Sequence, residues 1–260
     1  RSINASIRQT ETLRSLARDR LITDDDNESD LVVGLIPARW ASTRFEGKPL
    51  VNISGIPMIK RVYDRACMAK YLDTVVVLTD DERISNYCSS QEIRCIVIDD
   101  EVRSGTDRCA AALNMLDGRI FVNIQGDEPL INPDAIDTLI EQYGWGIGVA
   151  NAYVDIDQDY KLTDKNVVKV ALDKNRHAMH YSRLPISEYQ QMGLYAFSRD
   201  MLSVFPTLTV GENEEKENVE MLRYLENGYN VKMIKVEDDG LSVDTPHDVK
   251  LVELKLGEYH

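Results

Sequence analysis

Residues 31–50 read LVVGLIPARWASTRFEGKPL, an apolar run that passes into a loop of small and cationic residues. The apolar run Leu31–Ile36 predicts a strand that is buried on both faces. Similar runs return along the first half of the chain, at Thr74–Leu78, Arg94–Ile98 and Arg119–Ile124. Amphipathic stretches of helical length separate them, at Met58–Lys70, Glu82–Gln91 and Thr106–Leu116. This alternation predicts a three-layer α/β fold, in which helices cover both faces of a mostly parallel central sheet.

The loop after the first strand is a candidate binding site for a phosphorylated ligand. Ligands of parallel sheets bind at the carboxyl ends of the strands, and this loop carries the cations Arg39, Arg44 and Lys48. Small residues among the cations let the backbone approach a ligand closely. They are Ala38, Ala41, Ser42 and Gly47. Such a loop can neutralise a triphosphate with its cations and its backbone N–H groups, although a solvated loop with scattered charges would have the same composition.

Two acidic residues follow predicted strands elsewhere in the chain. Asp127 lies in the segment Asn123–Leu130 (NIQGDEPL), directly after the fourth strand. Asp244 lies in the segment Leu241–Asp248 (LSVDTPHD), which leads into a helix predicted from Pro246. A carboxylate at a strand end is where a magnesium ligand would lie. Asp244 also has a purely structural interpretation, because an aspartate before a helix is a common N-cap.

The segment Arg103–Arg108 (RSGTDR) is a weaker candidate, which offers hydroxyl and backbone N–H groups at the start of a helix. The second half of the chain is less regular. We expect strands at Val167–Leu172, Met192–Phe197 and Val231–Val236, and a helix at Glu215–Asn227. The segment from Asn151 to Tyr195 interrupts the strand–helix alternation and carries candidate exposed apolar residues. They are Val168, Val170, Met179 and Tyr181. Such an insertion predicts a homodimer.

Composition excludes several classes of protein. The formal net charge of −14 argues against duplex nucleic acid as the main partner, because the phosphate backbone repels an acidic chain. The four cysteines form no C-x-x-C pair, which argues against a zinc site. No apolar run is long enough to cross a bilayer and no signal peptide is recognisable, so we expect a cytoplasmic protein without a membrane partner. We assign residues 1–30 to a helical extension with an acidic linker, and residues 31–260 to one domain.

Four segments have now been singled out, which in chain order are Leu35–Leu50, Arg103–Arg108, Asn123–Leu130 and Leu241–Asp248. Together and in this order they resemble the motifs of the CMP-sugar synthetases, most closely those of the CMP-KDO synthetases, which activate 3-deoxy-manno-octulosonate. The I-P-A-R…S-T-R…G-K-P loop and the Q-G-D-E-P loop are specific in combination, and the resemblance runs from about Leu31 to Leu256. It implies a dimeric nucleotidyltransferase fold with a small dimerisation insertion. It also implies Mg²⁺ as the cofactor and CTP and a sugar acid as the substrates, in a pathway of cell-surface polysaccharide or lipopolysaccharide synthesis.

The resemblance also implies roles for particular residues. CTP would be bound by Ala38, Arg39, Ser42, Lys48, Ser104, Gly105, Thr106, Arg108 and Gln125. The catalytic group would consist of Arg39, Lys48, Asp127 and Asp244, of which the two aspartates would hold the metal. The sugar acid would contact Arg183, Tyr195 and Glu220. The sugar side departs from the family pattern, for example at Gln191, where the family commonly has histidine.

The expected reaction transfers CMP from CTP to the hydroxyl of a sugar acid similar to KDO and releases pyrophosphate. Catalysis of this kind depends mainly on positioning and on charge, which agrees with a motif set that contains no activated nucleophile. A different acceptor, such as a nonulosonic acid or a phosphonate, would use the same residues. A catalytically inactive nucleotide-binding scaffold is a third alternative, and a pyrophosphate-release assay would distinguish it from both enzymes.

Overall fold

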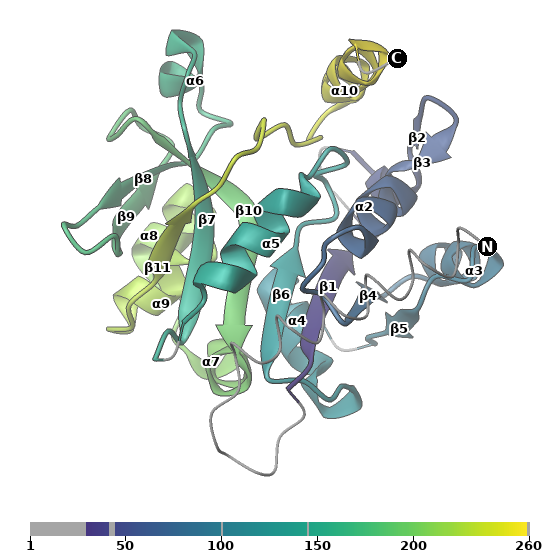
Figure 1. The fold of residues 1–260 in the computed structure, drawn as a ribbon, viewed down its shortest axis with the longest axis horizontal. Coiled ribbons are helices and arrows are strands. Elements are labelled where there is room, and N and C mark those ends of the chain that lie inside the picture. The colour runs from purple at the N-terminus through teal and green to yellow at the C-terminus, as the bar shows by residue number, and fades with distance from the viewer. Residues whose placement is uncertain (1–29, 42–44, 100, 145, 259–260) are drawn as a thin grey trace, which may run out of the picture.

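The structure, a computed structural model, describes residues 30–41, 45–99, 101–144 and 146–258. In this part of the chain, one sheet of nine strands forms the centre of the molecule (Figure 1). Its strands are β1 (Val32–Ala38), β4 (Thr74–Thr79), β5 (Cys95–Val97), β6 (Ile120–Ile124), β7 (Val149–Asp155), β8 (Lys169–Leu172), β9 (Ala178–Ser182), β10 (Tyr189–Ser198) and β11 (Lys232–Lys235). The order across the sheet is β11-β7-β10-β6-β1-β4-β5, with β8 paired to β10 and β9 paired to β8.

The sheet is mostly parallel, as the sequence predicts. Strand β1 is parallel to β4 and β6, and β4 is parallel to β5. Strand β10 is antiparallel to both β6 and β7, and β7 is parallel to β11. Strands β6 and β7 therefore point the same way, and the carboxyl ends of β1, β4, β6, β7 and β11 lie along one edge of the sheet. This edge brings together loops that are far apart in the sequence.

Helices cover both faces of the sheet, each over its own apolar core. Three helices pack on one face: α2 (Met58–Cys67), α3 (Glu82–Ser90) and α5 (Pro133–Gln142). The opposite face is covered by α4 (Gly105–Ala111), α7 (Arg199–Val204) and α9 (Leu222–Glu226), and α8 (Glu212–Glu217) packs beside α9. The three predicted layers are therefore confirmed.

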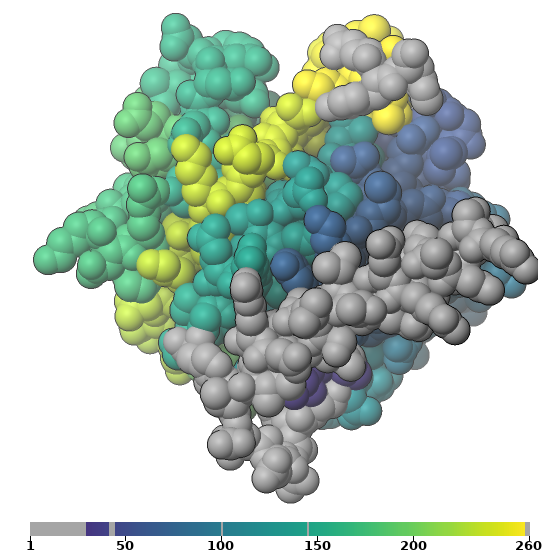
Figure 2. All heavy atoms as spheres, viewed as in Figure 1, coloured from purple at the N-terminus to yellow at the C-terminus, as the bar shows by residue number. Residues whose placement is uncertain are grey.

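A smaller apolar core lies beside the carboxyl edge of the sheet. It packs the C-terminal helix α10 (Pro246–Glu258) against a two-stranded hairpin of β2 (Asn52–Ile53) and β3 (Ile56–Pro57). Its buried residues are Ile53, Met58, Leu130, Val243, Val249 and Val252. In the space-filling view the molecular outline is indented between α10 and the short helix α6 (Asp159–Thr163), on the side toward which β1 and β6 point (Figures 1 and 2).

Two predicted helices differ from the structure. The stretch Glu215–Asn227 is not a single helix, because Asn218 adopts a left-handed conformation with φ of 54° and separates α8 from α9. The break lets Val219 enter the core while Glu220 turns toward α4. The stretch Thr106–Leu116 also ends early, since α4 stops at Ala111 and a 3₁₀ turn follows at Leu113–Met115.

The predicted insertion from Asn151 to Tyr195 joins the main sheet, because it contains β8 and β9 and parts of β7 and β10. Two of its expected exposed apolar residues, Val170 and Tyr181, are fully buried, so that part of the prediction is wrong. The reason is that β8 and β9 turn these side chains into the core that α9 covers. Met179, on the opposite side of β9, is 65% exposed as expected. No helix in the described residues has the length and apolar character needed to span a bilayer.

Candidate active site

The loop after β1 delivers the predicted phosphate-binding residues to the carboxyl edge of the sheet. Ala38 is the last residue of β1 and is buried, and the side chain of Arg39 that follows is exposed. Lys48 begins a short 3₁₀ turn, Lys48–Leu50, at the far end of the loop. Two other candidates from this loop, Ser42 and Arg44, lie outside the described residues. The chain therefore places one cation at each end of this loop.

The two described ends of the loop meet at Trp40. The Gly47 N–H donates a hydrogen bond to the Trp40 carbonyl oxygen (3.1 Å), and Trp40 Nε1 donates to Glu46 Oε1 (3.1 Å). The Arg83 guanidinium of α3 stacks on the indole ring, 3.6 Å from its centroid. Gly47 has φ of 69°, and a Cβ atom there would lie 2.9 and 3.0 Å from two ring carbons. Glycine at this position thus lets the loop pack on Trp40 and places Lys48.

The two predicted metal ligands converge on the side chain of Lys48. The Lys48 ammonium nitrogen lies 2.8 Å from Asp127 Oδ2 and 3.5 Å from Asp244 Oδ1. The Asp127 carbonyl oxygen accepts a hydrogen bond from the Val243 N–H (2.8 Å), which joins the segments that carry the two acids. These carboxylates are partly buried, with 27% and 29% of their side-chain surfaces exposed. Their oxygen atoms face one cation, which is the donor set that a hard ion such as Mg²⁺ prefers.

The hydrogen bonds at the start of α10 are made by the side chain of Asp248 and not by that of Asp244. The Asp248 carboxylate accepts hydrogen bonds from the Asp244 N–H (2.9 Å) and from the N–H (2.8 Å) and hydroxyl (3.0 Å) groups of Thr245. Asp248 thus reaches back to Thr245, the residue before α10, as the acidic residue of a capping box does. The carboxylate of Asp244 is turned toward Lys48.

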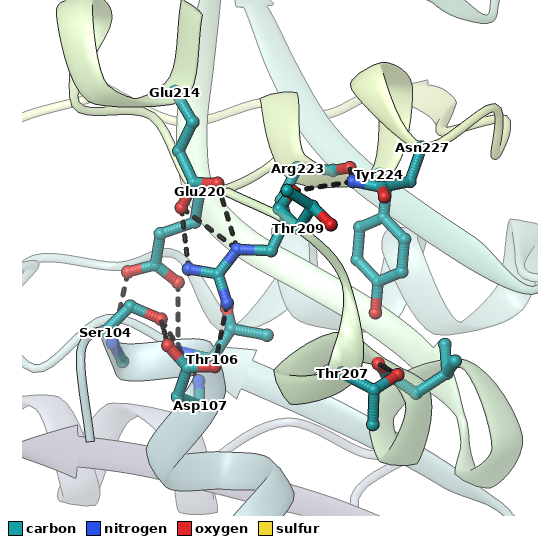
Figure 3. A network of polar contacts seen from close by, with 12 residues as sticks. Ser104, Thr106, Asp107, Thr207, Thr209, Glu214, Glu220, Arg223, Tyr224 and Asn227 are labelled. Atoms are coloured by element: carbon teal, nitrogen blue, oxygen red, sulfur yellow. Dashed lines mark hydrogen bonds and ion pairs between the residues drawn. The ribbon is translucent and has the colours of Figure 1, made fainter. Parts of the chain in front are cut away.

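The start of α4 is occupied by an acidic residue that the sequence assigned to the sugar side. The Glu220 carboxylate accepts hydrogen bonds from the N–H groups of Gly105 (3.1 Å) and Thr106 (2.9 Å) (Figure 3). Ser104 is the N-cap, and its hydroxyl oxygen accepts from the Asp107 N–H (3.1 Å). The segment that we expected to offer N–H groups to the nucleotide therefore binds Glu220 instead, so nucleotide and sugar candidates meet directly.

A buried ion-pair network ties this region to α8 and α9. Arg223 lies between Glu214 and Asp107, with nitrogen–oxygen distances of 2.7 and 2.9 Å (Figure 3). Its guanidinium also stacks on the Phe205 ring. Arg223 and its two partners are all buried. Removing one partner of such a network leaves an uncompensated buried charge, which strongly destabilises a protein. Sequence reasoning missed this network, although a lone arginine within the apolar run Met221–Leu225 was a visible signal.

Two predicted binding cations are engaged with other groups. The Arg108 side chain is buried, and its Nη2 lies 2.6 Å from Asp80 Oδ2. Arg183 Nη1 donates to the Lys165 carbonyl oxygen and Arg183 Nε to the Glu217 carbonyl oxygen, both at 2.9 Å. Arg183 thus braces loop carbonyls, and the structure gives it no hydrogen bond to Tyr195 or Glu220 within the described residues.

The remaining sugar-side candidate, Tyr195, lies on β10. Tyr195 is buried and its hydroxyl oxygen accepts a hydrogen bond from Gln191 Nε2 (2.7 Å). Burial holds the pKa of Tyr195 well above its usual range, so the hydroxyl keeps its proton. Gln125 lies between β10 and the nucleotide side, because its N–H donates to the Gly193 carbonyl oxygen (3.0 Å) and its side chain packs beside Gly105.

Glu128 is a further buried acid that the sequence analysis did not single out. Its Oε1 accepts a hydrogen bond from the Gly193 N–H (2.8 Å), which links the loop of Asp127 to β10. Burial raises the pKa of Glu128 to about 8, and the carboxylates of Asp238 and Asp127 add to the shift. Its position next to Asp127 in the Q-G-D-E-P motif was the available signal.

Within the described ranges, no group of three or more His, Cys, Asp or Glu side chains could hold a metal ion by itself. A site of two carboxylates fits Mg²⁺ nonetheless, because this ion commonly takes one or two protein carboxylates and completes its shell with water and substrate phosphates. Cations follow β1, and carboxylates follow β6 and β11, at one edge of the central sheet of a three-layer fold. This arrangement defines a nucleotidyltransferase.

The chain belongs to the cytidylyltransferase family, whose model matches residues 33–234. It is 39% identical to the 8-amino-3,8-dideoxy-manno-octulosonate cytidylyltransferase of Shewanella pealeana over 237 residues, 85% of this chain and 97% of the relative. It is also 39% identical to the 3-deoxy-manno-octulosonate cytidylyltransferase of Solibacter usitatus, over 85% of this chain and 92% of the relative. A solved structure of a CMP:2-keto-3-deoxy-manno-octonic acid synthetase complexed with CTP is similar, with a TM-score of 0.83, 31% identity and coverage of 89% of this chain and 100% of the other.

Replacing Gly47 with alanine is expected to displace the loop that carries Lys48. The added Cβ would lie within 3.0 Å of the Trp40 ring, on a backbone whose φ of 69° disfavours any side chain. Because Arg83 and Glu46 hold the ring, the loop must move. We expect CTP turnover to fall by on the order of tenfold, since small displacements of a positioned group have effects of at least this size.

The matched control is Gly55→Ala. Gly55 also has a positive φ, of 84°, but a Cβ atom there meets nothing within 4 Å. Both variants should lose about 1 kcal/mol of unfolding free energy in a denaturant titration, whereas only Gly47→Ala should slow pyrophosphate release. Equal rates for the two variants would show that contact with Trp40 does not position the loop.

Proposed function

We propose that this chain transfers the CMP group of CTP to a hydroxyl of a 3-deoxy-octulosonate sugar acid and releases pyrophosphate, with Mg²⁺ as the cofactor. The observation that carries the proposal is the convergence of Asp127 and Asp244 on Lys48 beside the loop of Arg39. The names of the relatives support the acceptor, since they act on 3-deoxy-manno-octulosonate or its 8-amino form.

The reaction forms one P–O bond, breaks another and releases the proton of the attacking hydroxyl. The sugar hydroxyl oxygen attacks the α-phosphorus of CTP in line with the bridging oxygen to the β-phosphorus, and that P–O bond breaks. The electron pair leaves with pyrophosphate, and the hydroxyl proton is lost to solvent. Arg39 and Lys48 bind the phosphate oxygens and stabilise the charge on the leaving group. Asp127 and Asp244 hold Mg²⁺, which when bound neutralises phosphate charge and lowers the pKa of the attacking hydroxyl.

The acceptor binds beside Tyr195 and Glu220 in this proposal. The neutral hydroxyl of Tyr195 and the amide of Gln191 form a hydrogen-bonding surface suited to sugar hydroxyl groups. Glu220 contacts the backbone of the nucleotide-side segment at Gly105 and Thr106. These contacts support a position for Glu220 between the two substrates.

The proposal is tested by incubating the protein with CTP, Mg²⁺ and single acceptors, and by mass spectrometry of the products. We expect a CMP adduct with 3-deoxy-manno-octulosonate or with its 8-amino form, and little adduct when ATP or GTP replaces CTP. If adducts form only with a nonulosonic acid or a phosphonate, that compound is the acceptor and the proposed sugar acid is wrong. Absence of pyrophosphate release with every acceptor would favour the inactive scaffold.

Asp127→Asn and Asp244→Asn should each lower turnover by roughly 100-fold or more. Asparagine keeps the volume and the hydrogen-bonding capacity of aspartate but loses the negative charge that holds a divalent cation. The control is Asp64→Asn, on the exposed face of α2, where Asp64 pairs with Lys60. Asp64→Asn should leave turnover unchanged. Near-normal turnover of either site variant in millimolar Mg²⁺ would remove that residue from the proposed metal site.

We further propose that the chain forms a homodimer through the surface of β9 and the segment after it. Three apolar side chains are exposed there: Met179 (65%), Leu184 (56%) and Ile186 (39%). Light scattering should give twice the chain mass of 29.5 kDa at micromolar protein. Leu184→Asp should shift this mass to that of a monomer, whereas Met68→Asp, at the end of α2 and 67% exposed, should not. A monomeric wild-type protein would contradict the proposal.

A further inference from the structure

A metal ion and the Lys48 ammonium would compete for the same carboxylate oxygen atoms. Lys48 Nζ lies 2.8 Å from Asp127 Oδ2 and 3.5 Å from Asp244 Oδ1, so the ammonium contacts both carboxylates. Mg²⁺ requires oxygen ligands at about 2.0–2.1 Å in a near-octahedral shell. On these oxygen atoms it would lie within a few ångströms of the ammonium, where two cations repel each other strongly. Metal binding through these atoms therefore favours withdrawal of the ammonium.

The side chain of Lys48 is able to move while its backbone stays in place. Its main chain is fixed by the 3₁₀ turn, in which the Lys48 N–H donates to the Phe45 carbonyl oxygen (3.3 Å) and the Lys48 carbonyl oxygen accepts from the Val51 N–H (3.1 Å). Beyond the Cα atom a lysine has a flexible four-carbon stem that ends in a point charge. The ammonium can thus leave the carboxylates without disturbing the loop.

We propose that Lys48 is an internal counter-ion, which keeps magnesium off Asp127 and Asp244 until the triphosphate of CTP draws its ammonium away. This inference rests on the proposed function and adds an order of events to it. The triphosphate offers the ammonium several anionic oxygens, and the departure of the ammonium removes a competing cation from the two carboxylates. CTP and the metal ion then bind cooperatively, and by thermodynamic linkage each strengthens the binding of the other by the same factor.

The arrangement also explains why the two acids can be held close together. Two carboxylates at this separation in a partly buried site repel each other, and the cation between them offsets that repulsion. Lys48 supplies the compensating charge before the metal does. The site is thereby preorganised, which lowers the free-energy cost of assembling it around the substrate.

The inference is tested by metal binding alone, with Mn²⁺ as the probe and the free ion measured by electron paramagnetic resonance. The protein is the full chain without nucleotide. Lys48→Met, which keeps the length of the side chain but removes its charge, should bind Mn²⁺ more tightly than the wild type by on the order of tenfold or more. Lys48→Arg keeps a cation and should bind as weakly as the wild type. Lys60→Met, which removes a lysine from the exposed face of α2, is the control for net charge and should leave the affinity unchanged.

A second arm adds a CTP analogue with a methylene group between its α- and β-phosphorus atoms. The analogue should raise the Mn²⁺ affinity of the wild type much more than that of Lys48→Met, because in the variant no ammonium has to be displaced. Melting temperatures measured with and without Mn²⁺ check that each variant is folded and report the same binding through mass action.

The outcomes separate this inference from the proposed function. If Asp127→Asn and Asp244→Asn leave Mn²⁺ binding unchanged, the proposed metal site is wrong. If those variants weaken binding but Lys48→Met binds no more tightly than the wild type, the metal site stands and the counter-ion inference is overturned. If Lys60→Met tightens Mn²⁺ binding as much as Lys48→Met does, the counter-ion inference is also overturned, because net charge alone would then explain the effect.

Discussion

The hydrogen bond from the Val243 N–H to the Asp127 carbonyl oxygen joins the two segments on which the site depends. It fixes the loop after β6 to the segment after β11, so the spacing of the two aspartates is set by main-chain geometry. The small apolar core around Leu130, Val243 and Val249 holds the same two segments from behind. The backbones that carry the two acids are thus positioned by main-chain pairing and by packing. A network held only by its own ion pairs would rearrange whenever a charged substrate entered.

A second set of contacts joins the two substrate sides. Glu220 binds the start of α4, while Arg223 connects α4 to α8 through Asp107 and Glu214 (Figure 3). Glu220, which lies just before α9, is therefore tied to the nucleotide-side segment.

The sequence predicted the features that depend on local pattern. Buried strands are readable from continuous apolar runs, and residues such as Lys48 and Asp127 are readable as strand-end groups because parallel strands share one carboxyl edge. What it could not predict depends on contacts between distant residues. The break at Asn218 interrupts a pattern that is locally helical, since only the core and α4 require Val219 and Glu220 to turn apart. The burial of Val170 and Tyr181 likewise follows from how the hairpin of β8 and β9 lies on the fold. Helix α5 was also absent from the prediction, although Asn132 and Pro133 form a recognisable helix start.

Strand β11 and the segment after it are the last parts of the fold to be synthesised, and they contribute more than an edge to the sheet. Most strands of the sheet, with the helices on both faces, precede Lys232 in the chain. A growing chain on the ribosome therefore contains most of its core-forming residues before Asp244 has been made. Until then it carries the cationic loop and Asp127 but lacks the second carboxylate. On the proposed metal site, the nascent polypeptide would acquire activity only when synthesis of the fold is nearly complete.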